Sequence, residues 1–168
     1  MPYSSLLRNR LSEAQQSYAL TFCVRNRMPA FKVPVAAFQI IEALKRSAAL
    51  GYCQSLAWVV MPDHIHWLVT LSEHCSLSSL VSATKGTASR GLRRHTNLRM
   101  PIWQPGYYDH RLRAEEDLVR QARYLIANPL RAGLVNNLAD YPYWYAMWAA
   151  PPHGPVRNGG TGEALLMP

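Results

Sequence analysis

The stretch WVVMPDHIHWLVTL, residues 58–71, constrains the fold more than any other part of the chain. Two short apolar runs flank a Pro-Asp break, which predicts two strands, 55–61 and 65–71, joined by a tight turn. Successive side chains of a strand point to opposite faces. One face of the second strand begins polar and becomes apolar: His64, His66, Leu68 and Thr70. The other face is wholly apolar: Ile65, Trp67, Val69 and Leu71. The chain must therefore bury one face and present two imidazoles on the other.

The histidine pair is a candidate metal site. Two residues at this spacing on one face of a strand have Cα atoms about 6–7 Å apart, which lets their ring nitrogens meet at one ion. The spacing is not specific by itself, because two hydrogen-bonded or exposed histidines would give the same pattern. His64 and His66 are therefore candidate ligands that need a third ligand elsewhere in the chain.

The charge of the chain favours a nucleic-acid partner. The formal net charge is +8, and the sequence contains 15 Arg but only 3 Lys. Arginine has a planar fork that pairs with phosphates and guanine edges and stacks on bases. A genome rich in Arg codons is the alternative explanation of this bias.

The cysteines and the hydropathy pattern indicate the compartment. Cys23, Cys53 and Cys75 are scattered without a metal-binding spacing, which favours a reducing environment. No apolar run approaches the roughly 20 residues of a membrane span, and the N-terminus has no signal-peptide core. We therefore expect a cytoplasmic protein with no membrane partner.

Periodicity along the chain predicts an α+β fold. We expect a first strand within 17–27, helices over 33–52 and 76–95, a loop and strand within 102–113, and a helix within 114–135 that Pro129 ends near Asn128. Together with the two strands above, this order predicts an antiparallel sheet with helices packed mainly on one face. We expect a single domain over residues 1–148. The Pro/Gly-rich stretch 149–168 is predicted to be a disordered tail.

The last predicted helix carries a tyrosine on its polar side. At about 100° per residue, the apolar side chains fall on one stripe: Leu118, Val119, Ala122, Leu125 and Ile126. Tyr124 lies on the opposite side, and Asn128 follows one turn later, so a phenol and an amide share one face. Tyr124 could simply cover a second layer or be exposed; otherwise its hydroxyl is presented to a ligand.

Three segments together resemble a known family. MPDHIHWLV, IWQPGYYDHRLR and ARYLIANPLRAGLV are similar, in this order and spacing, to the REP-associated tyrosine transposases, which belong to the HUH superfamily of single-strand transposases. The resemblance covers roughly residues 17–148 and implies a ferredoxin-like fold. One departure is that Asn128 stands where the insertion-sequence members usually have Gln.

The resemblance implies an enzyme and its site. Tyr124 would be the catalytic nucleophile, and His64, His66 and Asn128 would bind Mg²⁺ or Mn²⁺. The implied reaction is cleavage and rejoining of single-stranded DNA with palindromic hairpins through a 5′-phosphotyrosine. The REP-associated branch implies a monomer, with a homodimer as the alternative. Two other functions fit the same residues: a metal-dependent nuclease that uses activated water, and a catalytically inactive DNA-binding module.

Eight basic side chains are candidate DNA contacts, with an ordinary solvated basic face as the alternative. They are Arg25, Arg27, Lys85, Arg90, Arg93, Arg94, Arg111 and Arg113.

Overall fold

The computed structural model describes residues 13–98, 101–113 and 118–149. Five strands form one sheet in the order β4-β1-β3-β2-β5, and every neighbouring pair is antiparallel. The strands are β1 Ser17–Cys23, β2 Cys53–Val60, β3 His64–Leu71, β4 Tyr108–Arg111 and β5 Trp144–Ala146. The prediction of an α+β fold with an antiparallel sheet is confirmed.

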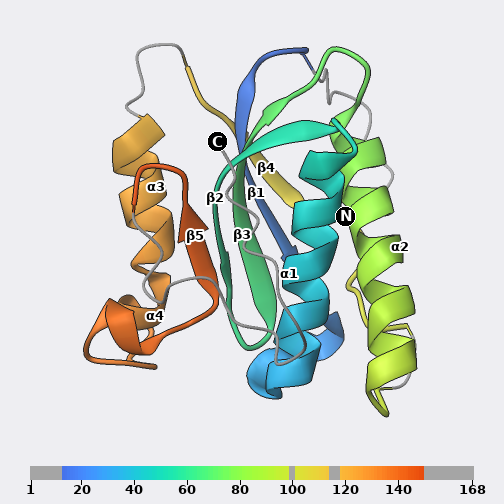
Figure 1. Ribbon diagram of the computed structural model, residues 1–168, viewed down its shortest axis with the longest axis vertical. Coiled ribbons are helices and arrows are strands. Elements are labelled where there is room, and N and C mark those ends of the chain that lie inside the picture. The colour runs from blue at the N-terminus through green and yellow to red at the C-terminus, as the bar shows by residue number, and fades with distance from the viewer. Residues whose placement is uncertain (1–12, 99–100, 114–117, 150–168) are drawn as a thin grey trace, which may run out of the picture.

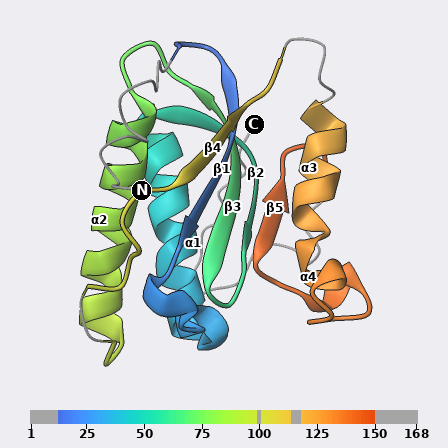
Figure 2. The ribbon, with the colours of Figure 1, turned by 180° about the vertical axis from the view of Figure 1, so that it is seen from behind.

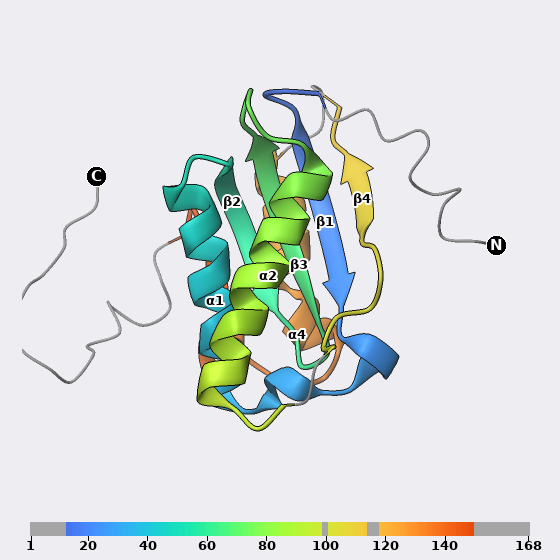
Figure 3. The same ribbon diagram turned by 90° about the vertical axis from the view of Figure 1, so that its right-hand side faces the viewer.

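Helices cover both faces of the sheet. The two long helices, α1 (Pro34–Ala49) and α2 (Leu77–His95), lie side by side on one face, while α3 (Leu118–Ile126) lies on the other (Figures 1 and 2). Figure 3 shows α1 and α2 in front of the sheet. The short helix α4 (Asn128–Arg131) follows α3. None of the helices in the described ranges is long and apolar enough to cross a membrane.

The ends of the long helices follow from local sequence. Pro34 occupies the first turn of α1, where a missing N–H costs no hydrogen bond. Gly51 follows that helix with a φ of +73°, a left-handed conformation that glycine adopts without steric cost. Ser76 caps α2, because its side chain accepts a hydrogen bond from the Ser79 N–H at 3.1 Å.

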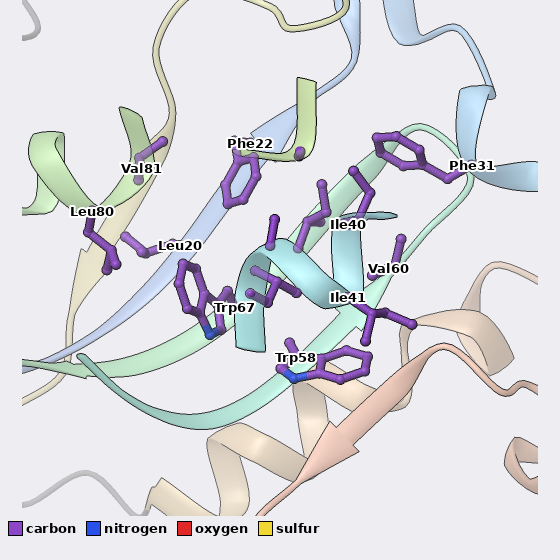
Figure 4. Close-up of a cluster of buried hydrophobic side chains, with 14 of the residues drawn as sticks. Leu20, Phe22, Phe31, Ile40, Ile41, Trp58, Val60, Trp67, Leu80 and Val81 are labelled. Carbon is purple, nitrogen blue, oxygen red and sulfur yellow. The ribbon is translucent and has the colours of Figure 1, made fainter. Parts of the chain in front are cut away.

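The alternation of β3 divides the core in two. Ile65 and Trp67 are fully buried on the side of α1 and α2, in the cluster drawn in Figure 4. Leu68 points to the other side and packs with Ala122 and Leu125 of α3. The two faces predicted for this strand are therefore the two faces observed. His64 and His66 share the face of Leu68, which α3 covers.

Three features differ from the sequence prediction or lie beyond the structure. The edge strand β5 was not predicted. The last predicted helix is interrupted: α3 ends at Ile126, and a second helical turn starts at Asn128, so Tyr124 and Asn128 lie on successive helices. Residues 150–168, nearly all of the predicted tail, and residues 114–117 lie outside the described ranges.

Candidate active site

The two histidine side chains meet at the start of β3. Nε2 of His64 lies 3.0 Å from Nε2 of His66, and the ring planes are nearly perpendicular, at 88°. β3 is flanked by β1 and β2, so the backbone that carries the pair is held on both sides. A central strand therefore fixes the spacing between the rings.

Each imidazole is oriented through its other nitrogen. Nδ1 of His64 lies 2.5 Å from Oδ1 of Asp63, and Nδ1 of His66 lies 2.8 Å from Oγ1 of Thr21. Thr21 stands directly opposite His66 in the pairing of β1 with β3. A carboxylate can only accept, so Nδ1 of His64 carries the proton in the neutral ring and Nε2 presents a lone pair.

Asp63 has a partner of its own. Arg27 NH1 lies 3.3 Å from Oδ2 of Asp63. Arg27 is placed there by a turn after β1, in which Asn26 and Arg27 have φ values of 56° and 53°. Non-glycine residues rarely adopt this conformation, so the turn is a strained local feature beside the site.

Burial keeps His66 neutral. Burial, followed by the positive charges of His64, Arg131 and Arg27, lowers the pKa of His66 to about 4. A neutral imidazole is the form that binds a metal. The ring therefore stays neutral throughout the neutral pH range.

The histidine pair fits a divalent cation. With Nδ1 of His64 donating to Asp63, its Nε2 accepts, and the 3.0 Å contact between the two Nε2 atoms holds one proton that a divalent cation would displace. Two ligands bound at right angles, each about 2.1 Å from one ion, are about 3.0 Å apart. Among the described residues, no group of three His, Cys, Asp or Glu side chains gathers at one point. Within the described ranges, a third protein ligand would therefore be of another type, such as an amide.

The break between α3 and α4 orients such an amide. Pro129 has no N–H, so it cannot donate to the Leu125 carbonyl one turn back. The side chain of Asn128 takes that place, with Nδ2 donating to the Leu125 carbonyl at 2.7 Å. This bond holds the Nδ2 end of the amide against the Leu125 carbonyl, so Oδ1 points away from that carbonyl. The sequence ANPL thus builds a fixed amide oxygen.

The nucleophile candidate lies just before this break. The side chain of Tyr124 is 64% exposed, although its helix neighbours Ala122 and Leu125 are buried. The prediction that Tyr124 lies on the outer side of the helix is confirmed. Its phenol is therefore accessible to a large ligand.

Arg131 joins the tyrosine and the amide. Its two terminal nitrogens donate to the Tyr124 carbonyl at 2.8 Å and to Oδ1 of Asn128 at 2.7 Å. Its Cζ lies 3.8 Å from the centre of the Tyr124 ring. It is also close enough to His66 for its charge to lower the pKa of that ring. The turn between β2 and β3 and the start of α4 lie at the same end of the sheet (Figure 1).

The basic residues predicted to contact DNA divide into three groups. Arg90 and Arg94 line a groove between α1 and α2, with a volume of about 560 Å³, together with Lys45 and Arg46. This groove is on the sheet face opposite α3. Three other predicted residues are exposed: Arg25, Arg93 and Arg113.

Arg27, Arg111 and Lys85 have protein partners that bear on their role. Arg27 pairs with Asp63, as described, and Arg111 pairs with Glu13 at 2.6 Å. Arg111 stands opposite Tyr18 in the pairing of β1 with β4, so it points to the sheet face away from the histidines. Lys85 is half-buried and donates to the carbonyls of Gln104 and Gly106 at 3.0 and 2.6 Å. These bonds attach the segment before β4 to α2.

Sequence reasoning missed Asp63, Thr21 and Arg131. Asp63 could have been found, because a carboxylate adjacent to a candidate ligand often orients it. Thr21 could not, because its role depends on the register of a strand 45 residues away. Arg131 had a weak signal in its position three residues after Asn128.

The antiparallel α+β scaffold carries a converging histidine pair on its central strand and an exposed tyrosine on the helix that covers the same face of the sheet. The chain belongs to the family described as Transposase IS200 like, which it matches over residues 12–124. The resemblance named from sequence is confirmed.

Relatives agree with this assignment. The chain is 33% identical over 90 residues to the REP-associated tyrosine transposase of Escherichia coli strain K12. The match covers 52% of this chain and 50% of the relative. A Haemophilus influenzae Rd protein named for the same class is 28% identical over 100 residues, or 54% of this chain and 57% of the relative. The matched region thus spans about half of the length of these relatives.

A solved structure has the same fold. It is described as a REP-associated tyrosine transposase bound to a REP hairpin, and it covers 95% of this chain and 98% of its own length, with a TM-score of 0.68 and 21% identity. At this level of identity the likeness establishes the fold alone.

Proposed function

We propose that this protein cleaves and rejoins single-stranded DNA, with Tyr124 as the nucleophile and with His64, His66 and Asn128 as ligands of Mg²⁺ or Mn²⁺. The observation that carries the proposal is the pair of Nε2 atoms 3.0 Å apart, each ring oriented through its Nδ1. Arg131 ties the nucleophile to the amide, and its positive charge acts on His66. Membership of the transposase family supports the same reaction class.

Tyr124 would attack a phosphodiester. A bond forms between its phenol oxygen and phosphorus, and the bond from phosphorus to the 3′ oxygen breaks. The phenol proton leaves to solvent, and the departing 3′ oxygen takes one up. The resulting 5′-phosphotyrosine ester conserves the bond energy, so a second 3′-hydroxyl can reverse the step and join two ends without ATP.

The ligands and their partners prepare the site for an anionic substrate. A divalent ion, when bound, supplies positive charge to a non-bridging phosphate oxygen. His64, His66 and Asn128 are all neutral donors, so they do not cancel that charge. Asp63 and Thr21 hold the two imidazoles so that Nε2, and not Nδ1, faces the ligand.

The proposed substrate is single-stranded DNA with a palindromic hairpin. One structural relative is described as bound to a REP hairpin. The net charge of +8 supports an anionic partner, and the groove of Arg90 and Arg94 offers phosphate contacts. We propose that the remaining exposed arginines add contacts to the backbone and that the protein acts as a monomer, with a homodimer as the alternative.

The test uses a hairpin-bearing single-stranded oligonucleotide, Mn²⁺ and intact mass spectrometry. Wild-type protein is expected to gain the mass of the cleaved strand, and EDTA is expected to abolish the gain. Tyr124→Phe removes only the hydroxyl and should give no adduct, whereas Tyr145→Phe, at a partly exposed tyrosine on β5, should behave as wild type. Cleavage without an adduct would favour the water-dependent nuclease. Binding without cleavage would favour an inactive DNA-binding module.

A further inference from the structure

Arg131 makes contacts that an ordinary surface arginine does not. One guanidinium joins the backbone of Tyr124, the ring of Tyr124 and the side-chain oxygen of Asn128, at 2.8, 3.8 and 2.7 Å respectively. These contacts span seven residues across the break between α3 and α4. Surface side chains rarely satisfy three such constraints at once, because fixing a long side chain costs entropy.

The geometry requires an arginine. A guanidinium has five N–H donors in one plane, so it can donate to two acceptors while its face stacks on an aromatic ring. The ammonium of lysine is a single point of charge and cannot do both. Two of the five donors of Arg131 are used in the contacts above.

The contact with Asn128 leaves the amide able to bind a cation. Nδ2 of Asn128 is held by the Leu125 carbonyl, and Oδ1 accepts from Arg131. A carbonyl oxygen has two lone pairs, so one remains for a further ligand. Without Arg131 the amide would be held at one end only, and the phenol would lose the plane that packs against it.

We propose that Arg131 is a positioning residue: it fixes the Asn128 amide oxygen and the Tyr124 ring relative to the histidine pair. This inference rests on the proposed function for the role of those two residues. Arg131 lies on α4 and acts on Tyr124 of α3, and it was not among the site residues predicted from the sequence.

The first arm of the test measures metal binding without DNA. Mn²⁺ is titrated into the full chain, and the free ion is followed by electron paramagnetic resonance. Arg131→Lys keeps the charge but loses the planar fork, and it should weaken Mn²⁺ binding about 10-fold. Arg123→Lys, a matched change of an exposed arginine on α3, should leave binding unchanged. Circular dichroism and the melting temperature check folding, and Arg131→Gln serves as a second variant.

A double-mutant cycle separates positioning from a general structural effect. If Arg131 acts through Asn128, Arg131→Lys should change Mn²⁺ affinity less than 2-fold in an Asn128→Ala background. A loss of the same size in both backgrounds would overturn the inference. So would an Arg131→Lys protein that binds Mn²⁺ as wild type does while Asn128→Ala binds it more weakly.

The second arm measures adduct formation at saturating DNA. Arg131→Lys is expected to slow the rate about 10–100-fold with little change in the DNA concentration for half-maximal rate. If Arg131→Lys, as a single substitution, forms the adduct at the wild-type rate, Arg131 does not position Tyr124. If wild-type protein forms no adduct, the proposed function fails, and the Mn²⁺ arm still decides the role of Arg131.

Discussion

Asp63 and His64 form the shortest contact in the candidate site: Oδ1 of the carboxylate lies 2.5 Å from Nδ1 of the imidazole. The carboxylate holds one tautomer and one ring orientation, and Arg27 holds the carboxylate in turn. We expect Asp63→Asn to lower both Mn²⁺ affinity and the rate of adduct formation about 10–100-fold, because the neutral amide orients the ring less strongly. Mn²⁺ titration and single-turnover assays measure the two effects.

Glu42→Gln provides the control for a lost carboxylate. Glu42 pairs with Lys45 on the exposed side of α1, at 3.5 Å. This variant should keep wild-type metal affinity and the wild-type rate at saturating DNA, since an exposed pair of this kind contributes little. Equal behaviour of Asp63→Asn and wild-type protein would remove Asp63 from the site.

Thr21 plays the corresponding role for His66. Thr21→Val keeps the shape and β-propensity of the side chain but leaves Nδ1 of the half-buried ring without its partner. We expect the free energy of unfolding to fall by about 1–3 kcal/mol, and adduct formation to slow. Thr70→Val, which breaks the 3.0 Å contact with Ser17 on the same strand pair, should affect stability without a specific loss of rate. Urea titration and adduct assays of both variants make the comparison.

The low pKa of His66 predicts an acid-dependent loss of stability. In the unfolded chain its imidazole titrates near 6.5, whereas in the folded chain the pKa is about 4. Between these values the unfolded state binds more protons, so the free energy of unfolding falls as the pH is lowered from 6.5 to 4. The expected loss is roughly 1–3 kcal/mol, measured by urea titration in EDTA.

The contribution of His66 can be isolated by substitution. His66→Gln should flatten this part of the pH profile, whereas His74→Gln, at an exposed histidine, should leave it as in wild type. A profile that His66→Gln does not change would assign the acid sensitivity to other groups.

The strands and the long helices could be predicted because their signals are local. Alternation along HIHWLV placed the histidines on one face and Trp67 on the other, and apolar periodicity located the two long helices. The edge strand β5 has only three residues, and its pairing with β2 depends on the completed sheet. A stretch this short and this aromatic has no strand pattern of its own.

The candidate site residues could be named from the sequence, but the contacts that orient them were only partly predictable. Asn128 was expected to end the helix of Tyr124, yet it begins a new one, because Pro129 cannot supply a hydrogen bond and Asn128 supplies one instead. The contact between Arg27 and Asp63 needs a left-handed turn at Asn26, which no local pattern indicates. Contacts that form only after the chain has folded cannot be inferred from residue spacing.

Lys85 was predicted to contact DNA, but its contacts are those of a cation that stabilises the fold. It donates to two carbonyls of the segment before β4, and burial lowers its pKa to about 8. Lys85→Met should lower the free energy of unfolding by about 1–3 kcal/mol, because the carbonyls of Gln104 and Gly106 lose their donor. Its affinity for DNA should be unchanged at constant salt.

Arg94→Met removes a cation in the same way, but we expect it to weaken DNA binding and not stability. Arg94 is exposed and lines the groove between α1 and α2, so its loss should change stability by no more than about 0.5 kcal/mol. DNA affinity should fall, and the slope of log affinity against log salt should decrease by about one, because one phosphate contact is lost. Urea titration and fluorescence anisotropy at several salt concentrations measure both variants. A Lys85→Met protein with full stability and weakened DNA binding would reverse the two assignments and place the DNA backbone along the segment before β4.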